Sequence, residues 1–161
     1  MKKFARIAGT GRYLPPRIIT NAELEKSLDT TDEWITSRTG IKERRVVEDQ
    51  NTCDLALEAS INALEMAELK TSEIDLIILA TTTPDKIFPA TATMLQDRIS
   101  ASCPAFDLQA VCAGFVFALT TAQQYIENGV YKNILVVGSE TMSKIVDWND
   151  RSTAILFGDG A

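Results

Sequence analysis

The sequence predicts an α/β fold in which a mainly parallel, five-stranded sheet is covered by helices. Short, almost wholly apolar runs such as residues 74–81 are typical of strands that are buried on both faces of a sheet. Between these runs lie segments whose apolar residues recur every three or four positions, which is the period of an amphipathic helix. Because strands and helices alternate along the chain, we expect parallel strands joined by helical connections.

Five segments are predicted strands. The first runs into a glycine-containing turn, and the third alternates partly between apolar and polar residues. The second, the fourth and the fifth are apolar runs, and the fifth stands near the end of the sequence. In chain order the predicted strands are residues 4–11, 74–81, 105–111, 133–138 and 153–158.

Capping residues mark the predicted helices. Threonines before acidic residues at capping-box spacing begin the first two, and Gly40 ends the second. Asn51 caps a long amphipathic helix, and Asn128 with Gly129 gives a stop signal to the last one. The helices predicted in this way cover about residues 20–28, 30–38, 51–67, 89–100 and 112–128.

Composition excludes several kinds of protein. A net charge of −6 argues against a nucleic-acid surface, which needs an excess of clustered Lys and Arg. The three cysteines form no C-x-x-C pair, so neither a disulfide framework nor a zinc site is indicated. The longest apolar run, residues 110–119, is shorter than the roughly 18 residues that cross a bilayer. We therefore expect a cytoplasmic protein without a metal, a nucleic-acid partner or a membrane partner.

One basic cluster stands out in this acidic chain. It contains Arg38, Lys42, Arg44 and Arg45. Two interpretations remain open: a solvated loop, or a surface that attracts a phosphorylated ligand.

Cys112 is the strongest candidate for chemistry. It stands where the third predicted strand becomes a helix, with Ala113 and Gly114 following. The unpaired N–H groups and the positive dipole end of a helix favour the thiolate form of such a cysteine, and the thiolate is the nucleophile. The alternative is a cysteine that only fills space beneath the helix, since cysteine is among the most often buried residues.

Four separated segments resemble one enzyme family. They are residues 30–44 (TTDEWITSRTGIKER), 80–89, 103–119 (CPAFDLQAVCAGFVFAL) and 150–161 (DRSTAILFGDGA), and together they are similar to the N-terminal half of β-ketoacyl-acyl carrier protein synthase III. The likeness extends from about residue 7 to residue 161. It implies a thiolase-like fold, in which two similar α/β halves form an αβαβα sandwich. Residues 1–161 would be the N-terminal half, and the C-terminal half would lie outside this chain.

The resemblance also implies an activity. Such an acyltransferase moves an acyl group, typically from acetyl-CoA, to a cysteine and then condenses it with malonyl-carrier protein, with loss of CO2. Cys112 would be the nucleophile, and no cofactor beyond the acyl-CoA substrate is implied. The His and Asn of the condensation step belong to the other half in this family, and this chain contains no histidine.

Other positions acquire roles only through the resemblance. Trp34 and Arg151 would clamp the CoA adenine, with further CoA contacts from Thr30 and Arg38. Three further positions would line or close the acyl pocket: Phe88, Met142 and Phe157. Phe88 would do so by reaching across a homodimer interface. Without the resemblance, each of the three is interpreted as an ordinary core residue.

Two other functions stay open at this point. One is a related condensing enzyme that makes a specialised product and uses a different nucleophile. The other is a non-catalytic, truncated dimerisation module, suggested by the absence of histidine and by a sequence that stops directly after an apolar run. The primer's length and branching and the carrier-protein contacts do not follow from the sequence.

Overall fold

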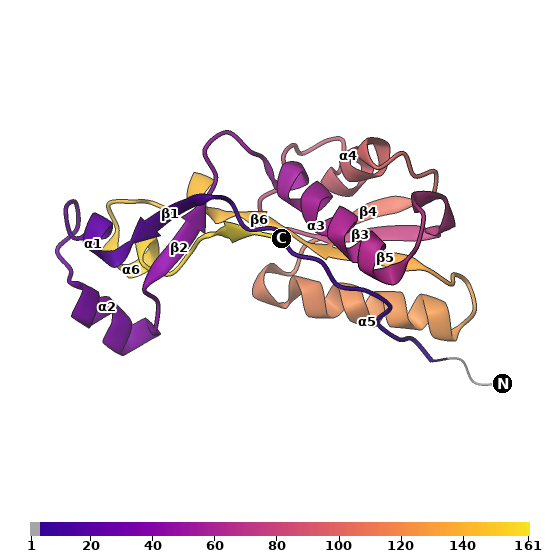
Figure 1. The fold of residues 1–161 in the computed structure, drawn as a ribbon, viewed down its shortest axis with the longest axis horizontal. Coiled ribbons are helices and arrows are strands. Elements are labelled where there is room, and N and C mark those ends of the chain that lie inside the picture. The colour runs from indigo at the N-terminus through magenta and orange to yellow at the C-terminus, as the bar shows by residue number, and fades with distance from the viewer. Residues whose placement is uncertain (1–3) are drawn as a thin grey trace.

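The computed structural model describes residues 4–161 and has two parts of unequal size (Figure 1). The larger part, the sheet body, contains β3, β4 and β5 with the helices α3, α4 and α5. The smaller part, the side lobe, contains β1, β2, α1, α2 and α6. The body and the lobe lie end to end along the longest axis of the molecule.

The sheet body is a three-layer arrangement around one fully buried strand. β3 (Leu76–Ala80) lies between β4 (Ala105–Leu108) and β5 (Ile134–Gly138), and both neighbours are parallel to it. Residues on alternate sides of β3 face different helices, as the strand's period of two requires. The α3 and α4 layer covers Ile77 and Leu79, whereas the α5 layer covers Leu76, Ile78 and Ala80.

Helix termini in the body follow local sequence signals. α3 (Thr52–Ala67) begins after Asn51 with a capping box completed by Asp54. α4 (Thr91–Arg98) has no side-chain cap of its own, but the Asp107 carboxylate accepts from the amides of Thr91 and Ala92 at 2.8 and 2.7 Å. α5 (Gly114–Glu127) ends at Asn128, and Gly129 then takes a left-handed φ of 75°. The three body helices predicted from the sequence are therefore present.

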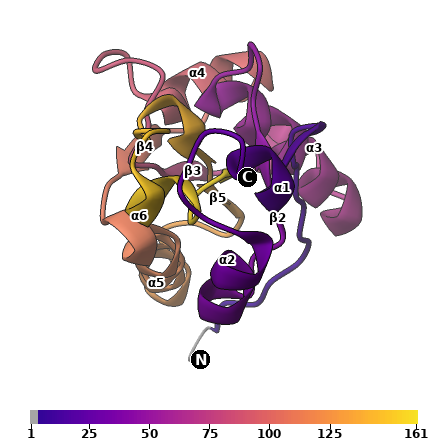
Figure 2. The ribbon, with the colours of Figure 1, turned by 90° about the vertical axis from the view of Figure 1, so that its left-hand side faces the viewer.

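The side lobe has a small core of its own. β1 (Arg17–Thr20) pairs antiparallel with β2 (Glu43–Val46), and α1 (Asn21–Leu24), α2 (Asp32–Thr39) and α6 (Arg151–Ala154) surround the pair (Figure 2). Ile35, Val46 and Ala154 are buried at its centre. α2 ends at Gly40 with φ 73°, as the sequence predicts, but α1 is shorter than the predicted helix.

Short elements connect the two parts. β6 (Glu140–Thr141) pairs antiparallel with β7 (Asp159–Gly160), and this ribbon lies at the junction of body and lobe (Figure 1). Three single-turn 3-10 helices complete the structure: η1 (Thr71–Glu73), η2 (Val111–Ala113) and η3 (Met142–Lys144).

The thiolase-like α/β fold class is correct, but two of the five predicted strands are not strands in the described chain. Residues 4–11 have no strand assignment, and Gly9 and Gly11 lie against α3 so closely that an added Cβ would collide with the backbone of Ala63 or Ala59. These glycines permit close packing and do not form the predicted turn. Residues 153–158 begin inside α6, where Asp150 caps the helix by accepting from the Ser152 amide. The parallel sheet therefore has three strands.

The basic cluster does not form one binding surface. Arg44 is 5% exposed, and its guanidinium donates to the carbonyls of Ile19 and Ile155 and to Asn21 Oδ1 at 2.9–3.1 Å. Burial also lowers the pKa of Arg44 from its usual value. Arg44 thus joins β1, α1 and the segment after α6, and it is not available to a phosphorylated ligand.

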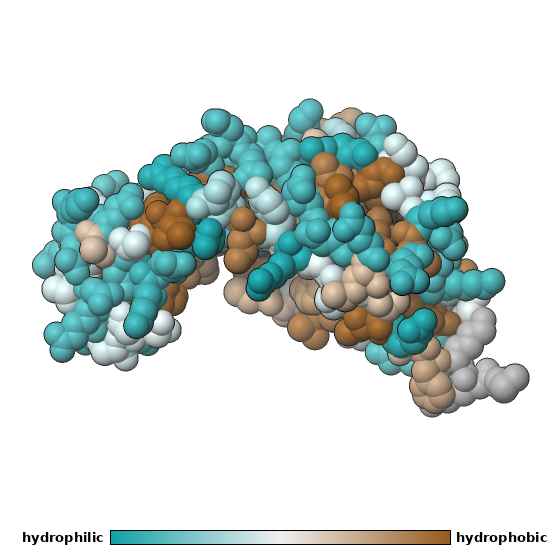
Figure 3. Space-filling view, viewed as in Figure 1, coloured by the Kyte–Doolittle hydropathy of each residue, from teal (hydrophilic) through white to brown (hydrophobic). Residues whose placement is uncertain are grey.

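The described surface is apolar along α5. Phe115, Val116 and Phe117 are each about half exposed, at 46, 60 and 54%. Figure 3 shows brown surface along the lower edge of the body, where α5 lies in Figure 1. Within residues 4–161, no helix combines the length and the hydropathy that a membrane span requires.

Candidate active site

Cys112 lies in the turn that joins the last residue of β4 to the first residue of α5. It is the middle residue of η2, and α5 begins two residues later at Gly114. Cys112 is exposed, whereas Cys53 and Cys103 are buried, and burial raises the pKa of both buried thiols. Ala113 is the N-cap of α5 and makes no side-chain cap hydrogen bond, so no protein side chain caps the helix end that follows the cysteine. This arrangement suits a nucleophile beside a helix N-terminus.

The residue before Cys112 is strained. Val111 has a φ of 49°, in the left-handed region that β-branched residues rarely adopt. Backbone strain of this kind costs on the order of 1–3 kcal/mol and persists only where the surrounding structure enforces it. The hydrophobic periodicity of the sequence does not indicate this backbone strain, because a positive φ is expected from sequence mainly at glycine, asparagine or aspartate.

Close packing on the sheet enforces the conformation of this turn. A Cβ added to Gly114 would lie 3.2 Å from Ala80 Cβ at the end of β3. A Cβ added to Gly138, at the end of β5, would meet the Phe115 ring at 3.1 Å. The start of α5 therefore rests directly on the carboxyl ends of two neighbouring strands, which leaves the Cys112 turn little freedom to move.

A second group of predicted residues meets in the side lobe. The guanidinium carbons of Arg38 and Arg151 lie 4.3 and 4.6 Å from the centre of the Trp34 ring, within cation–π distance. Arg151 also donates from Nη1 to the Asp29 carbonyl at 2.8 Å. The resemblance predicts that the Trp34 ring and the Arg151 guanidinium clamp the adenine of CoA. It does not predict the direct contact between these two side chains.

Thr30 lies beside this cluster in sequence and has an unusual hydroxyl. Its Oγ1 is buried and has no hydrogen-bond partner among the described residues. Its amide donates to the Leu28 carbonyl at 2.9 Å, which fixes the turn that leads into α2. Trp34 itself packs against the lobe core, so its ring is anchored on one side and partly open on the other.

The three predicted pocket residues lie in three different connections of the described chain. Phe88 is 86% exposed in the loop between β3 and α4, followed by a cis bond to Pro89. Met142 begins η3, and Phe157 stands between α6 and β7, both partly buried. Their role as an acyl pocket stays a prediction.

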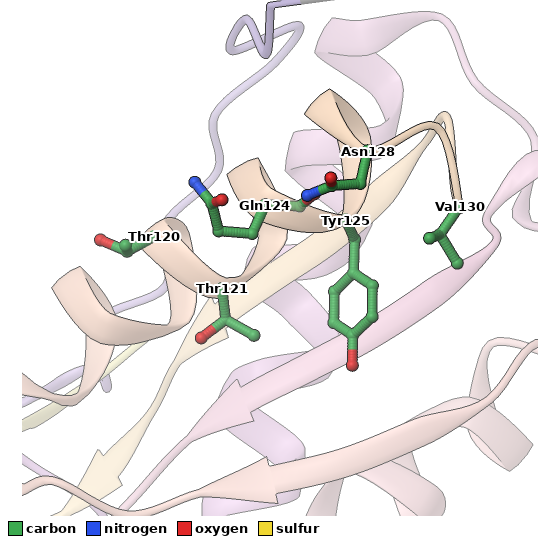
Figure 4. Close-up of a pocket in the computed structure, with 6 residues that line it drawn as sticks. All are labelled: Thr120, Thr121, Gln124, Tyr125, Asn128 and Val130. Atoms are coloured by element: carbon green, nitrogen blue, oxygen red, sulfur yellow. The ribbon is translucent and has the colours of Figure 1, made fainter.

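Two surface cavities occur elsewhere. One, of about 470 Å³, follows the second half of α5 and the turn after it (Figure 4) and is lined by Thr120, Thr121, Gln124, Tyr125, Asn128 and Val130. The other, of about 340 Å³, lies where the β1–β2 pair meets η3 and includes Val47, Lys144 and Trp148. No predicted site residue lines either cavity. The described residues also hold no group of three or more His, Cys, Asp or Glu side chains placed to bind a metal ion.

The surface is hollowed between the site regions. Figure 1 shows the first turn of α5, which follows Cys112, at the end of the body that faces the side lobe. Figure 3 shows a concave surface between the lobe and the body on this side. Cys112 and the Trp34 cluster thus belong to the two parts of the molecule that border one hollow.

Comparison with known proteins gives one consistent result. A sequence profile of the 3-oxoacyl-[acyl-carrier-protein] synthase III family matches residues 106–161. The β-ketoacyl-[acyl-carrier-protein] synthase III of Vesicomyosocius okutanii is 67% identical over all 161 residues, which make up 51% of that protein. The chain therefore spans about half the length of the curated relatives it matches.

Solved structures agree with the sequence relatives. The 3-oxoacyl-[acyl-carrier-protein] synthase III of Aquifex aeolicus superimposes with a TM-score of 0.94 at 50% identity, over 99% of this chain and 51% of that one. The priming β-ketosynthase of the R1128 polyketide pathway superimposes with a TM-score of 0.95 at 39% identity, over 99% of this chain and 48% of that one.

Proposed function

Because this chain is homologous over its whole length to the N-terminal portion of β-ketoacyl-[acyl-carrier-protein] synthase III, we propose that it carries the acyl-accepting half of such an enzyme. The observation that carries the proposal is the exposed Cys112 in the tightly packed turn before α5. The whole enzyme would condense an acyl-CoA primer with malonyl-carrier protein and so start fatty-acid synthesis.

The first half-reaction needs a nucleophile and an oxyanion site. The Cys112 sulfur attacks the thioester carbonyl of acetyl-CoA, a tetrahedral oxyanion forms, and the C–S bond to CoA breaks. Coenzyme A leaves as the thiolate and takes up a proton, while the acetyl group stays on Cys112. The backbone amide of Cys112, just before α5, is the candidate donor that this chain offers to the oxyanion.

The side lobe would hold the nucleotide end of the substrate. Trp34 offers an aromatic face, and Arg38 and Arg151 offer cationic contacts. Thr30 would contribute only if its buried hydroxyl became accessible when the substrate binds. An adenine between Trp34 and Arg151 needs about 7 Å between the two planes, because each contact takes about 3.5 Å. Since Arg151 lies 4.6 Å from the ring centre, we expect it to swing outward when the substrate binds.

Other parts of the proposal concern residues and partners outside this chain. Decarboxylation and condensation would use a His and an Asn from the other half, and acyl carrier protein would deliver the malonyl group. We place the enzyme in the cytoplasm as a homodimer in which Phe88 reaches the partner's acyl pocket, beside Met142 and Phe157. The high exposure of Phe88 and of Ile87 before it supports a contact with another subunit. No cofactor beyond the acyl-CoA is required.

Mass spectrometry of acetylated protein tests the proposal. The product of the whole reading frame is incubated with acetyl-CoA, and we expect one acetyl group on the peptide that contains Cys112. The variant Cys112→Ala should take up none, whereas Cys103→Ala should be acetylated as the unsubstituted protein is. Acetyl on Cys53 or Cys103, or on no cysteine, would contradict the proposed function.

A second candidate is a condensing enzyme for a specialised product. The high similarity to a priming β-ketosynthase of a polyketide pathway favours it. The two candidates differ in the acceptor: after acetylation, the fatty-acid enzyme consumes malonyl-carrier protein, and the specialised one transfers its acyl group to another nucleophile. Product analysis with malonyl-carrier protein as the acceptor separates them.

A further inference from the structure

The carboxylate of Glu140 in β6 holds the loop that follows β3. One of its oxygens accepts from the Thr82 amide at 2.7 Å. The other accepts from the Thr83 amide at 3.1 Å, the Thr83 hydroxyl at 2.6 Å and the Thr81 hydroxyl at 3.3 Å. No Lys or Arg of residues 4–161 lies within ion-pair distance of it. Four donors from three consecutive threonines therefore converge on one acidic side chain.

The last residue of β3 and the first residue of this loop contact the chain on the two sides of Cys112. The Thr81 amide donates at 3.2 Å to the carbonyl of Leu108, the residue at which β4 ends and the turn begins. Ala80, directly before Thr81, supplies the Cβ against which Gly114 packs. The carbonyl of Ala80 also accepts from the Ser139 amide at 3.2 Å. The chain on either side of Cys112 is thus aligned by residues 80–81, and the loop that continues from them is fixed by Glu140.

We propose that Glu140 is a positioning residue for Cys112, acting through the Thr81–Thr83 loop; this inference rests on the proposed function. The carboxylate touches no substrate and is suited to the task because a carboxylate is purely an acceptor, matched here to donors only. A glutamine amide in place of this carboxylate would direct its NH2 group, which is itself a donor, toward one set of the threonine donors, and those hydrogen bonds would be lost. The loop would shift, and with it the contacts at Leu108 and Gly114 that orient the cysteine.

Kinetics of acetylation test the inference in the product of the whole reading frame. In Glu140→Gln we expect the maximal rate of Cys112 acetylation to fall by about tenfold to a hundredfold, since a displacement of about 1 Å at a reacting group costs about a hundredfold. The acetyl-CoA concentration at half-saturation should stay within twofold, because the Trp34 cluster lies in the other part of the molecule. The control Glu127→Gln makes the same chemical change at the end of α5, where within residues 4–161 the carboxylate accepts only from Gln123, and should leave both values unchanged.

A second readout does not depend on the proposed function. Hydrogen–deuterium exchange of a peptide covering residues 109–115 should be faster in Glu140→Gln, while a peptide from the middle of α3 exchanges as before. If the unsubstituted protein is not acetylated on Cys112 but this exchange difference appears, the proposed function fails and the positioning of the turn by Glu140 stands. Unchanged exchange, or a wild-type maximal rate in a folded variant, overturns the positioning role.

A milder variant covers the case in which Glu140→Gln does not fold. Thr81→Val keeps the shape of the side chain and removes one hydroxyl that donates to Glu140 and accepts from the Thr83 amide at 3.1 Å. We expect a fall in maximal rate of about twofold to fivefold with the same half-saturating concentration, since a smaller displacement costs proportionately less. Acetylation at the wild-type maximal rate in this variant counts against the inference in the same way.

Discussion

The sheet body and the side lobe hold their candidate site residues by different means. In the body, Cys112 is placed by backbone packed on backbone, since Gly114 rests on Ala80 and β3 is buried along its whole length. In the lobe, the guanidinium groups of Arg38 and Arg151 are held on Trp34 by stacking at a solvent-exposed surface, where each contact contributes only about 0.5–1 kcal/mol.

This difference assigns different tasks to the two parts. A nucleophile must be held within a fraction of an ångström of its reacting position, and rigid strand ends provide that. A clamp for a flat base must open and close, and weakly held side chains permit that. Substitutions in the body should therefore alter the maximal rate of acetylation, and substitutions in the lobe should alter the substrate concentration that is required.

Among the substitutions that test this comparison, the largest effect is expected from Gly114→Ala. The new Cβ would lie 3.2 Å from Ala80 Cβ, so the Cys112 turn must move by a few tenths of an ångström. We expect the maximal rate of acetylation to fall by roughly tenfold or more, with an unchanged half-saturating acetyl-CoA concentration. Rapid-quench measurements of acetyl transfer give both values.

The double variant Gly114→Ala with Ala80→Gly is the control for this prediction. It removes the methyl group that the new Cβ meets, so the rate should recover although the protein loses some stability. A double variant as slow as Gly114→Ala would show that crowding against Ala80 is not the cause.

Local signals allowed most of the sheet body to be predicted from the sequence. α3 has a capping residue, a regular apolar period and a length that leaves little ambiguity, and β3 is an apolar run flanked by polar residues. The apolar run at 153–158 was misread because a short run fits a strand and a helix end equally well. The hydrogen bond from the Ser152 amide to Asp150 decides in favour of the helix.

The side lobe was harder to predict because its contacts are between residues distant in sequence. From the sequence alone, Arg44 is interpreted as a surface charge. In the structure its guanidinium donates hydrogen bonds to the carbonyls of Ile19 and Ile155. Trp34 and Arg151 are 117 residues apart (151 − 34), and resemblance to a family suggested their association whereas periodicity did not. The strain at Val111 left no trace in the sequence, since β-branched residues are normally poor candidates for a positive φ.

A smaller effect is expected from Trp34→Ala in the lobe. Loss of a stacking surface for a base costs about 1 kcal/mol or somewhat more, which corresponds to about fivefold to tenfold weaker binding. We expect the half-saturating acetyl-CoA concentration to rise by that factor while the maximal rate of acetylation is retained. Saturation kinetics of acetylation measure both.

Trp148→Ala is a matched control for the lobe. Trp148 packs against the same lobe core as Trp34, but among the described residues no guanidinium stacks on its ring. Its removal should lower the free energy of unfolding and leave the half-saturating concentration within twofold. Equal weakening by both substitutions would mean that the lobe core, and not the Trp34 ring, determines binding.

The smallest effect is expected at the far edge of the body, in Asp75→Asn. The Asp75 carboxylate accepts from the amides of Asn133 and Lys132 at 2.9 and 2.8 Å, and these bonds hold its pKa below the usual value. A lowered pKa in the folded state means that the group stabilises the protein above its unfolded pKa and loses this contribution as the pH falls through the folded pKa. We expect Asp75→Asn to lower the free energy of unfolding by about 1 kcal/mol at pH 7, and the difference to shrink in acid.

Urea unfolding at neutral pH and at a pH below the ordinary range of aspartate measures this difference in the free energy of unfolding. The exposed Asp97→Asn is the control and should change little at either pH. The maximal rate of acetylation should not change, because Asp75 supports the strand ends opposite to those on which the Cys112 turn rests; a rate that falls with stability would mean that the whole body, and not the carboxyl ends of its strands, sets the position of the cysteine.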